Sequence, residues 1–164
     1  MVAFGISLAN YAKQIEKVIL ADISQEALAI ASENAKKNKV EEKIEIVQTN
    51  LWDKIEGKFD VIVSNPPYIP TQQIGLLAKD VQQEPRLALD GGTDGLDFYR
   101  KILEKAEEYL TEDGILLCEI GYDEAKAVKD LLEKQIKVRE TKLEWETVVK
   151  DLAGLDRTII IRRK

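Results

Sequence analysis

A run of ten residues, F-D-V-I-V-S-N-P-P-Y from Phe59 to Tyr68, says most about the fold class. Its first part has the length and apolar character of a buried β-strand. Its last part changes abruptly to an asparagine, two prolines and an aromatic residue. Nearly continuous apolar strands are typical of a parallel sheet covered on both faces. Because ligands of such sheets bind at the carboxyl ends of the strands, this polar end is the first candidate for a functional site.

The rest of the chain alternates between short apolar runs and helical patterns, which predicts an α/β fold in a single domain, residues 1–164. Helices are predicted at residues 4–14, 24–38, 95–110 and 124–133, and strands at residues 18–21, 44–47, 59–64, 114–120 and 158–161. Residues 136–141 and 145–149 are predicted to form two strands or one bent ribbon. Residues 65–93 are predicted to be a long loop, which in a compact domain is usually functional or disordered.

The composition excludes several classes of function. Lys and Arg number 24 against 30 Asp and Glu, for a net charge of -6, whereas proteins that bind the phosphate backbone usually carry a basic face. The chain has no histidine, which removes Ser-His and Cys-His catalysis and most zinc sites. We therefore expect neither a nucleic-acid partner nor a metal site.

A cytoplasmic location is expected. Cys118 is the single cysteine, so the chain cannot form an internal disulfide, as fits a reducing compartment, and Cys118 is predicted to lie in the core. The apolar runs are far shorter than the roughly 20 residues of a membrane span. The first residues lack the basic leader and long apolar stretch of a signal peptide.

Two candidate binding positions follow the first two predicted strands. Asp22 ends its strand, where a carboxylate can accept two hydrogen bonds from a ribose diol; alternatively, it is a carboxylate at the entry of the next helix. Asn50 follows the second strand in T-N-L-W-D. Its amide could bind an adenine edge while Leu51 or Trp52 covers the face of the base. The alternative is a polar turn with an apolar staple, and the residue types do not separate the two.

The third candidate is the segment Asn65-Pro66-Pro67-Tyr68. Proline fixes φ and pushes its predecessor towards extended conformations, so Asn65 and Pro66 are both constrained. The Asn65 side chain, the Pro66 carbonyl and the Tyr68 ring suit a planar –NH₂ group, with two acceptors and one aromatic wall. Such a clamp would act by orienting the nitrogen towards an electrophile, which needs no strong base. The alternative is a rigid exit from the strand.

A fourth stretch, E-P-R-L-A-L-D-G-G-T-D-G-L-D-F-Y-R from Glu84 to Arg100, is rich in glycine. Its residue types are explained by a loop with turns, followed by a helix that Thr93 or Asp94 can cap.

With these motifs, the chain resembles the HemK-type methyltransferases, which modify the glutamine amide of peptide-chain release factors. The resemblance covers almost the whole chain and is carried by A-D-I-S, N-P-P-Y, the Glu84–Arg100 stretch, E-I-G-Y at Glu119–Tyr122 and K-D-L-A-G-L-D-R at Lys150–Arg157. N-P-P-Y is shared by amino-methylating enzymes with several substrates, whereas the Glu84–Arg100 stretch is much more specific.

The resemblance implies a Rossmann-like class I methyltransferase sheet flanked by helices and S-adenosylmethionine as the cofactor. It implies that Asp22 holds the ribose and that Asn50 and Leu51 lie at the adenine, where relatives often have Asp and an aromatic residue. Asn65 would touch both cofactor and substrate. The resemblance assigns catalysis to Asn65, Pro66 and Tyr68 and places the substrate glutamine along Asn65, Pro66, Pro67 and Tyr68.

The chain departs from the family pattern at its N-terminus. The family's first strand, its glycine-rich cofactor loop and its N-terminal helical domain have no counterpart in this sequence. Gly5 is interpreted as a small helix position rather than a cofactor glycine. The absence of a central strand is expected to leave unpaired backbone groups or to make neighbouring strands re-pair, and a second copy of the chain could pair at the exposed edge.

The predicted function is methyl transfer from S-adenosylmethionine to a glutamine side-chain amide in a release factor, in translation termination, with activity impaired by the missing loop. One alternative is an adenine amino-methyltransferase acting on nucleic acid, which has a similar –NH₂ target. The other is a non-catalytic remnant of the fold. For the chain as given, we expect weak or undetectable binding of S-adenosylmethionine.

Overall fold

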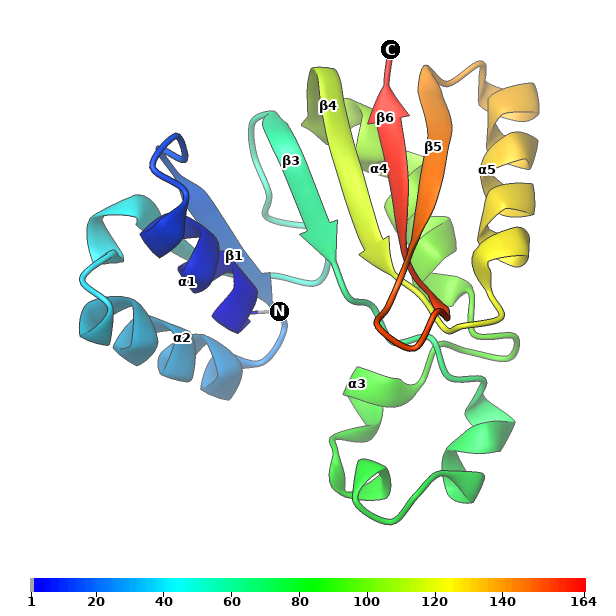
Figure 1. Ribbon diagram of the computed structural model, residues 1–164, viewed down its shortest axis with the longest axis horizontal. Coiled ribbons are helices and arrows are strands. Elements are labelled where there is room, and N and C mark those ends of the chain that lie inside the picture. Colours follow the sequence, from blue (N-terminus) through cyan, green and yellow to red (C-terminus); the bar gives the residue numbers. More distant parts are fainter. Residues whose placement is uncertain (1) are drawn as a thin grey trace. The chain divides into compact units, whose positions relative to one another are not determined.

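The computed structural model describes residues 2–164, whose contacts divide the chain into two compact units, one up to Glu56 and one from Gly57 to Lys164 (Figure 1). Each unit has its own sheet. Within the described residues, no helix is both long enough and apolar enough to cross a bilayer.

The first unit is a small α/β arrangement around two parallel strands. Its elements are α1 (Val2–Tyr11), β1 (Val18–Asp22), α2 (Gln25–Lys37), the 3₁₀ turn η1 (Glu41–Lys43) and β2 (Ile44–Gln48). The two strands pair in register from Val18 opposite Ile44 to Asp22 opposite Gln48. Ser24 caps α2, because its hydroxyl accepts the Ala27 N–H at 3.1 Å.

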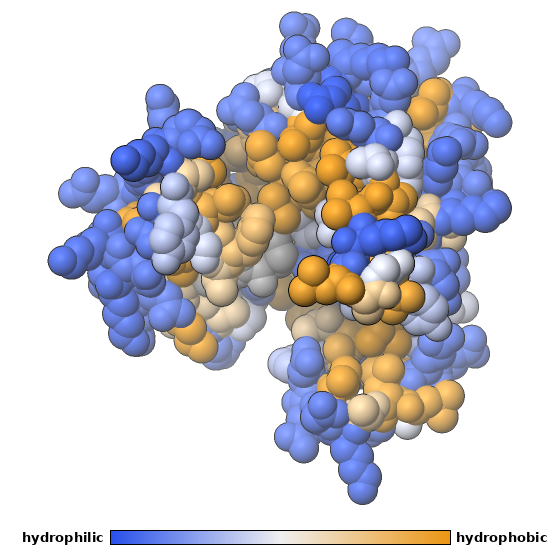
Figure 2. Space-filling model, in the orientation of Figure 1, coloured by the Kyte–Doolittle hydropathy of each residue, from blue (hydrophilic) through white to orange (hydrophobic). Residues whose placement is uncertain are grey.

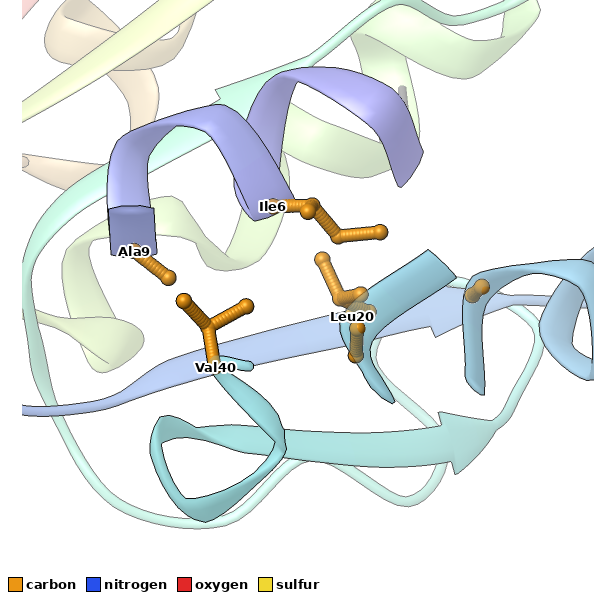
Figure 3. Packing of buried hydrophobic residues seen from close by; sticks show 6 residues of the cluster. Ile6, Ala9, Leu20 and Val40 are labelled. Atoms are coloured by element: carbon orange, nitrogen blue, oxygen red, sulfur yellow. The ribbon is translucent and has the colours of Figure 1, made fainter. Parts of the chain in front are cut away.

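The core of the first unit lies between its helices and β1. Buried Ile6 and Ala9 of α1 point toward Leu20 and Val40 (Figure 3). A Cβ atom on Gly5 would lie 2.4 Å from the Leu20 Cδ2 atom, so the missing side chain lets α1 approach β1 closely. Gly5 is therefore a small helix position, as predicted.

The second unit contains a four-stranded mixed sheet. Its strands are β3 (Phe59–Ser64), β4 (Leu110–Glu119), β5 (Leu143–Lys150) and β6 (Asp156–Arg163), in the order β3-β4-β6-β5. β3 is parallel to β4, whereas β6 is antiparallel to both of its neighbours. The expectation of a parallel sheet is confirmed for β3 and β4 but is wrong for β5 and β6, which a short turn joins and which must therefore be antiparallel.

Two long helices, α4 (Asp97–Tyr109) and α5 (Ala125–Arg139), pack with the strands of this unit. The buried face of α4 is formed by Tyr99, Ile102, Leu103 and Ala106, flanked by buried Leu96 and Leu110. Cys118 of β4 is buried as predicted. The segment between β3 and α4 holds three short helical turns, η2 (Thr71–Leu76), η3 (Val81–Gln83) and α3 (Arg86–Leu89). It is therefore a structured excursion rather than a plain loop.

Coverage of the sheets is less complete than predicted. Val61 of β3 is 49% exposed and Ile46 of β2 is 36% exposed. Figure 2 shows apolar residues over β3 and β4, whereas hydrophilic residues dominate over α2 and α5. These strands therefore keep apolar surface that no described residue covers.

The prediction of a strand at residues 136–141 is wrong, because α5 continues to Arg139. Glu140 ends the helix in the left-handed conformation, with φ of 53°, and its N–H bonds to the Ile136 carbonyl at 3.1 Å. The alternation in I-K-V-R is too short to distinguish a strand from helical turns, and extending an existing helix costs far less than starting a strand. The second half of the predicted ribbon is confirmed as β5.

The two sheets bear on the expectation about a missing central strand. Within the first unit β1 pairs with β2, and within the second unit β3 pairs with β4. Re-pairing of the strands that flank the missing one, and pairing of this edge with a second copy, both stay predictions.

Two substitutions on α5 test the extended helix, in a Trp52→Phe background where Trp145 reports unfolding of the second unit. Leu132 is fully buried, so Leu132→Ala should lower the free energy of unfolding by about 2–5 kcal/mol. Val138 is 73% exposed, and alanine has the higher helix propensity, so Val138→Ala should change it by less than about 0.5 kcal/mol. Urea titration measures both values, and a similar loss at both positions would restore the strand prediction.

Candidate functional site

The carboxyl end of β1 places Asp22 at the turn into α2. Its Oδ1 atom accepts the Ser24 N–H at 2.9 Å, and its backbone carbonyl accepts the Thr49 N–H at 3.0 Å. The helix-entry interpretation of Asp22 is therefore correct for one carboxylate oxygen. The second carboxylate oxygen can still accept a hydrogen bond from a diol, so the two interpretations are compatible.

Asn50 and Leu51 lie in a tight turn directly after β2, and the turn depends on Thr49. Thr49 is buried, and its hydroxyl accepts the Lys54 N–H at 3.0 Å and donates to the Leu51 carbonyl at 3.4 Å. Leu51 has φ of 51° in the left-handed region, and Asn50 is exposed. Sequence reasoning missed Thr49, although a threonine between an apolar strand and a polar turn was a signal for it.

An open depression of about 280 Å³ lies at this end of the first sheet and is lined by Ile23, Gln48, Thr49, Asn50, Asp53 and Lys54. Asp22 does not line the depression, but its strand neighbour Gln48 and the next residue, Ile23, do. The roles of Asp22 at a ribose and of Asn50 at an adenine stay predictions.

In the second unit, the segment Asn65–Tyr68 leaves the end of β3. Asn65 is exposed, Pro66 is buried and Tyr68 is half-buried. The chain then pairs with the glycine-rich stretch: the Ile69 N–H bonds to the Leu89 carbonyl at 3.0 Å, and the Gly91 N–H bonds to the Ile69 carbonyl at 2.9 Å. The segment is therefore anchored at β3 on one side and in a parallel bridge between Ile69 and Asp90 on the other.

Two glycines of the fourth stretch lie directly against the Tyr68 backbone. A Cβ atom on Gly91 would lie 2.8 Å from the Tyr68 Cα and carbonyl carbon, and one on Gly95 would lie 2.4 Å from the Tyr68 oxygen. Gly95 also has φ of 82°, a conformation that side chains rarely adopt. The Glu84–Arg100 stretch is therefore more than a loop with a helix cap, because two of its glycines pack against the backbone of the candidate clamp segment, Asn65–Tyr68.

The predicted cap of α4 is not formed by Thr93 or Asp94. The capping position is Leu96, which has no side-chain cap. Asp94 instead accepts the Leu96 N–H at 3.2 Å and forms an ion pair with Arg100. Its carboxylate therefore closes the turn before the helix rather than the helix itself.

A buried polar cluster lies beneath Tyr68. The hydroxyl of fully buried Tyr99 donates to the Glu119 carbonyl at 2.8 Å and lies 3.4 Å from Glu124 Oε2. Glu124 Oε2 also accepts the Gly121 N–H at 2.9 Å, and a Cβ atom on Gly95 would lie 2.7 Å from Glu124 Oε1. The Glu124 carboxyl and the Tyr68 carbonyl therefore lie against the same glycine.

The electrostatics of this cluster are perturbed. Burial raises the pKa of Glu124 to about 7, against the lowering effect of the hydrogen bond from Gly121. Burial also raises the pKa values of Tyr68 and Tyr99. At Tyr68 the negative charge of Glu119 adds to the rise, and Arg157 opposes it. Perturbed titratable groups gather at functional sites more often than elsewhere.

The predicted site residues fall into two groups. Asp22, Asn50 and Leu51 gather at one end of the first sheet, and Asn65, Pro66, Pro67 and Tyr68 form one continuous segment of the second unit. Their roles in binding and catalysis stay predictions. Sequence reasoning also missed Tyr99 and Glu124 as members of the site. Tyr99 lies on α4 and Glu124 directly precedes α5, so only the folded chain brings them near the segment after β3.

A larger depression in the second unit, about 330 Å³, lies away from these residues. It is lined by Lys58, Leu103, Glu104, Glu107, Glu108, Gln135, Arg139, Thr141 and Arg163. Lys58 precedes β3, so this depression is at the opposite end of that strand from Asn65. Its lining mixes acidic and basic side chains and contains no predicted site residue.

Comparison with known proteins gives a consistent picture. The profile of a family described as Methyltransferase small domain matches residues 3–92. The chain is 42% identical over 163 residues to a protein of Moorella thermoacetica named release factor glutamine methyltransferase, covering 99% of this chain and 56% of that protein. It is 40% identical over 118 residues to a protein of Francisella tularensis named ribosomal protein uL3 glutamine methyltransferase, covering 71% of this chain and 37% of that protein.

Among solved structures, TrmN from Thermus thermophilus has a TM-score of 0.63 at 15% identity, covering 97% of this chain and 40% of that chain. At that identity the likeness shows the fold alone, which is the class I methyltransferase fold expected from the sequence. The chain spans about half the length of the curated relatives that it matches, 56% and 55% for the first two.

Gly95→Ala tests whether the glycine-rich stretch supports Tyr68. Gly57 is the matched control, because it has a similar φ of 89° but no atom within 4 Å of an added Cβ. Gly57→Ala should cost only the backbone strain, about 1–2 kcal/mol. Gly95→Ala should lower the free energy of unfolding by about 1–3 kcal/mol more, because of the clash with Tyr68. Equal losses in urea titration would show that the close approach is not real.

The effect of pH on stability tests the half-buried carboxyl of Glu124 through the variant Glu124→Gln. The folded-state pKa of about 7 lies above the ordinary 4.5, so the folded protein binds the proton more tightly and loses stability as pH rises from 4.5 through 7. Glutamine resembles the protonated form, so from pH 5 to pH 8 the variant should gain about 1 kcal/mol relative to the parent, after allowance for partial exposure. Unfolding free energies at both pH values measure this gain. Parallel stability profiles for Glu124→Gln and the parent would contradict the raised pKa of Glu124.

Proposed function

The chain belongs to the Methyltransferase small domain family, and from that premise we propose that it is the catalytic part of a protein methyltransferase. The proposed reaction transfers a methyl group from S-adenosylmethionine to the side-chain amide nitrogen of a glutamine in a peptide-chain release factor. The observation that carries the proposal is the segment Asn65–Tyr68, held rigidly at the end of β3. The relatives' names support glutamine as the target.

The chain's own residues supply position rather than proton transfer. S-adenosylmethionine, when bound, supplies an electrophilic methyl carbon on its sulfonium. The Asn65 amide oxygen and the Pro66 carbonyl would accept the two hydrogens of the glutamine –NH₂ group, while the Tyr68 ring covers one face of the amide. Because both N–H bonds are held in the plane of the amide and Tyr68 covers one face, the nitrogen can attack the methyl carbon only from the other face. Such orientation can lower the barrier by several kcal/mol.

The proton balance needs no histidine. The amide nitrogen would take the methyl group that the bound cofactor supplies, with the electron pair of the broken carbon–sulfur bond left on sulfur. The methylated nitrogen would then lose one proton to solvent. A chain without histidine can therefore perform this reaction with the acceptors of the clamp alone.

The proposed substrate is a release factor rather than ribosomal protein uL3, because the match to the relative named for a release factor covers 99% of the chain against 71%. The net charge of -6 and the relatives' names both favour a protein over nucleic acid. The proposed compartment is the cytoplasm, where translation takes place.

The proposal is tested with two proteins: the chain as given, and the chain extended by the segment that precedes the matched region in the Moorella thermoacetica relative. Each is incubated with a release factor and methyl-labelled S-adenosylmethionine, and the label is located by mass spectrometry. We expect methylation at one glutamine by the extended protein. The chain as given should bind S-adenosylmethionine more weakly than about 1 μM in calorimetry. No glutamine methylation by the extended protein would reject the proposed function.

Asn65→Ala in the extended protein tests the clamp. Loss of a positioning contact should lower the rate of methyl transfer by about 100-fold. Because Asn65 is exposed, the free energy of unfolding should change by less than about 0.5 kcal/mol. A large loss of stability with unchanged turnover would instead support the rigid-strand-exit interpretation.

A further inference from the structure

Glu124, the half-buried residue directly before α5, contacts three other parts of the second unit. Its Oε2 atom accepts the Gly121 N–H at 2.9 Å and lies 3.4 Å from the hydroxyl of Tyr99 on α4. Its Oε1 atom lies against Gly95, where an added Cβ atom would be only 2.7 Å away. Glu124 therefore joins the end of β4, helix α4 and the glycine-rich stretch.

The contact with Gly95 leads directly to the clamp segment, Asn65–Tyr68. The same added Cβ atom on Gly95 would lie 2.4 Å from the Tyr68 carbonyl oxygen and 3.4 Å from its carbonyl carbon. Gly95 is thus in close contact with both the Glu124 carboxyl and the Tyr68 backbone, which leaves it little room to move. A change of size at Glu124 should therefore shift Gly95 and, through it, the end of the clamp segment.

The hydrogen bonds of Tyr99 favour a neutral carboxyl at Glu124. A tyrosine hydroxyl has one hydrogen to donate, and Tyr99 donates it to the Glu119 carbonyl at 2.8 Å. The oxygen of that hydroxyl can then accept a hydrogen bond from Glu124 only if Glu124 carries a proton. The three groups would then form a chain of hydrogen bonds that ends on the backbone of β4.

The surroundings of Glu124 act in the same direction. Burial raises the pKa of its carboxyl to about 7, although the hydrogen bond from Gly121 opposes the rise. Asp123, in the same turn, and Asp94, in the glycine-rich stretch, are both acidic, so their charges also favour the protonated form. Burial raises the pKa of Tyr68 as well, so its phenol stays neutral and adds no charge.

We propose that Glu124 is a positioning residue that acts as a neutral carboxyl, holding Gly95 against the Tyr68 carbonyl and so fixing the end of the clamp segment. The effect on methyl transfer rests on the proposed function, whereas the contacts of Glu124 with Gly95, Gly121 and Tyr99 do not. Glu124 acts through Gly95 and Tyr68 rather than on the reacting atoms.

The state of the carboxyl is tested in the chain as given by NMR of the Gly121 amide, whose N–H bonds directly to Glu124. Its proton shift should titrate with a midpoint of about pH 7, because the bond strengthens when the carboxyl loses its proton. Glu124→Gln should abolish this titration. A midpoint near the ordinary 4.5, or no titration in the parent, would overturn the proposal.

Hydrogen exchange then tests the link to the clamp segment. The Ile69 and Gly91 N–H groups close the bridge that anchors this segment, and their exchange relative to the β4–β6 ladder reports local opening. At about pH 6, Glu124→Ala should raise this relative exchange about tenfold, because the carboxyl no longer supports Gly95. Glu124→Gln should raise it by less than about twofold, since glutamine keeps the size of the neutral carboxyl.

The matched control is Glu107→Ala on α4. Glu107 is also half-buried, and its carboxylate also accepts a hydroxyl and a backbone N–H, those of Thr141 and Lys142. It lines the larger depression, away from the predicted site residues, and should leave the relative exchange of the bridge amides unchanged. An equal rise in Glu107→Ala, or no rise in Glu124→Ala, would overturn the proposal.

A kinetic readout separates this proposal from the proposed function. In the extended protein, Glu124→Ala should lower kcat about tenfold and leave KM for S-adenosylmethionine within about twofold, because the clamp orients the amide rather than the cofactor. Glu124→Gln should restore most of kcat, and above about pH 7 it should exceed the parent, which loses its neutral carboxyl there. Faster exchange of the bridge amides in Glu124→Ala, without any glutamine methylation by the parent, would reject the proposed function alone. Methylation with unchanged kcat in Glu124→Ala would reject the positioning role alone.

Discussion

The second unit depends on the close approach of Gly91 and Gly95 to the backbone of Tyr68. The chain leaves β3 at Ser64, travels through three short helical turns, and returns alongside the residues that it left. The two chain segments that this bridge joins can approach each other only because Gly91 and Gly95 have no Cβ atom. That contact fixes where the clamp segment lies and where α4 can begin.

Polar groups concentrate at the same place, which is unusual for a core. Tyr99 is fully buried, and the half-buried Glu124 carboxyl lies against it with a pKa raised to about 7. A hydrophobic pair would avoid the desolvation cost of these groups. Polar groups that are buried at a cost in stability are expected at functional sites. Here they lie next to the segment Asn65–Tyr68, whose backbone is already restricted by two prolines.

The two halves of the proposed reaction fall in different compact units. The residues suited to a nucleoside, Asp22 and Asn50, end parallel strands of the first unit, and the amide clamp ends β3 in the second. In both units the polar side chains follow the carboxyl end of a parallel strand, as is usual for ligand sites in α/β sheets. Hydrogen bonds of the Thr49 hydroxyl hold the turn in the first unit, and contacts with Gly91 and Gly95 support the clamp segment in the second.

Much of the fold could be read from the printed residues. Apolar runs of strand length located β1 to β6, and helical spacing located α4, because apolar residues repeat with the period of the element. Residues 136–141 were misassigned because four alternating residues are too few to define a period. The clamp residues were recognisable because proline and asparagine constrain the chain locally. Its support by Gly91 and Gly95 depends on contacts between residues far apart in sequence, which arise only when the chain folds.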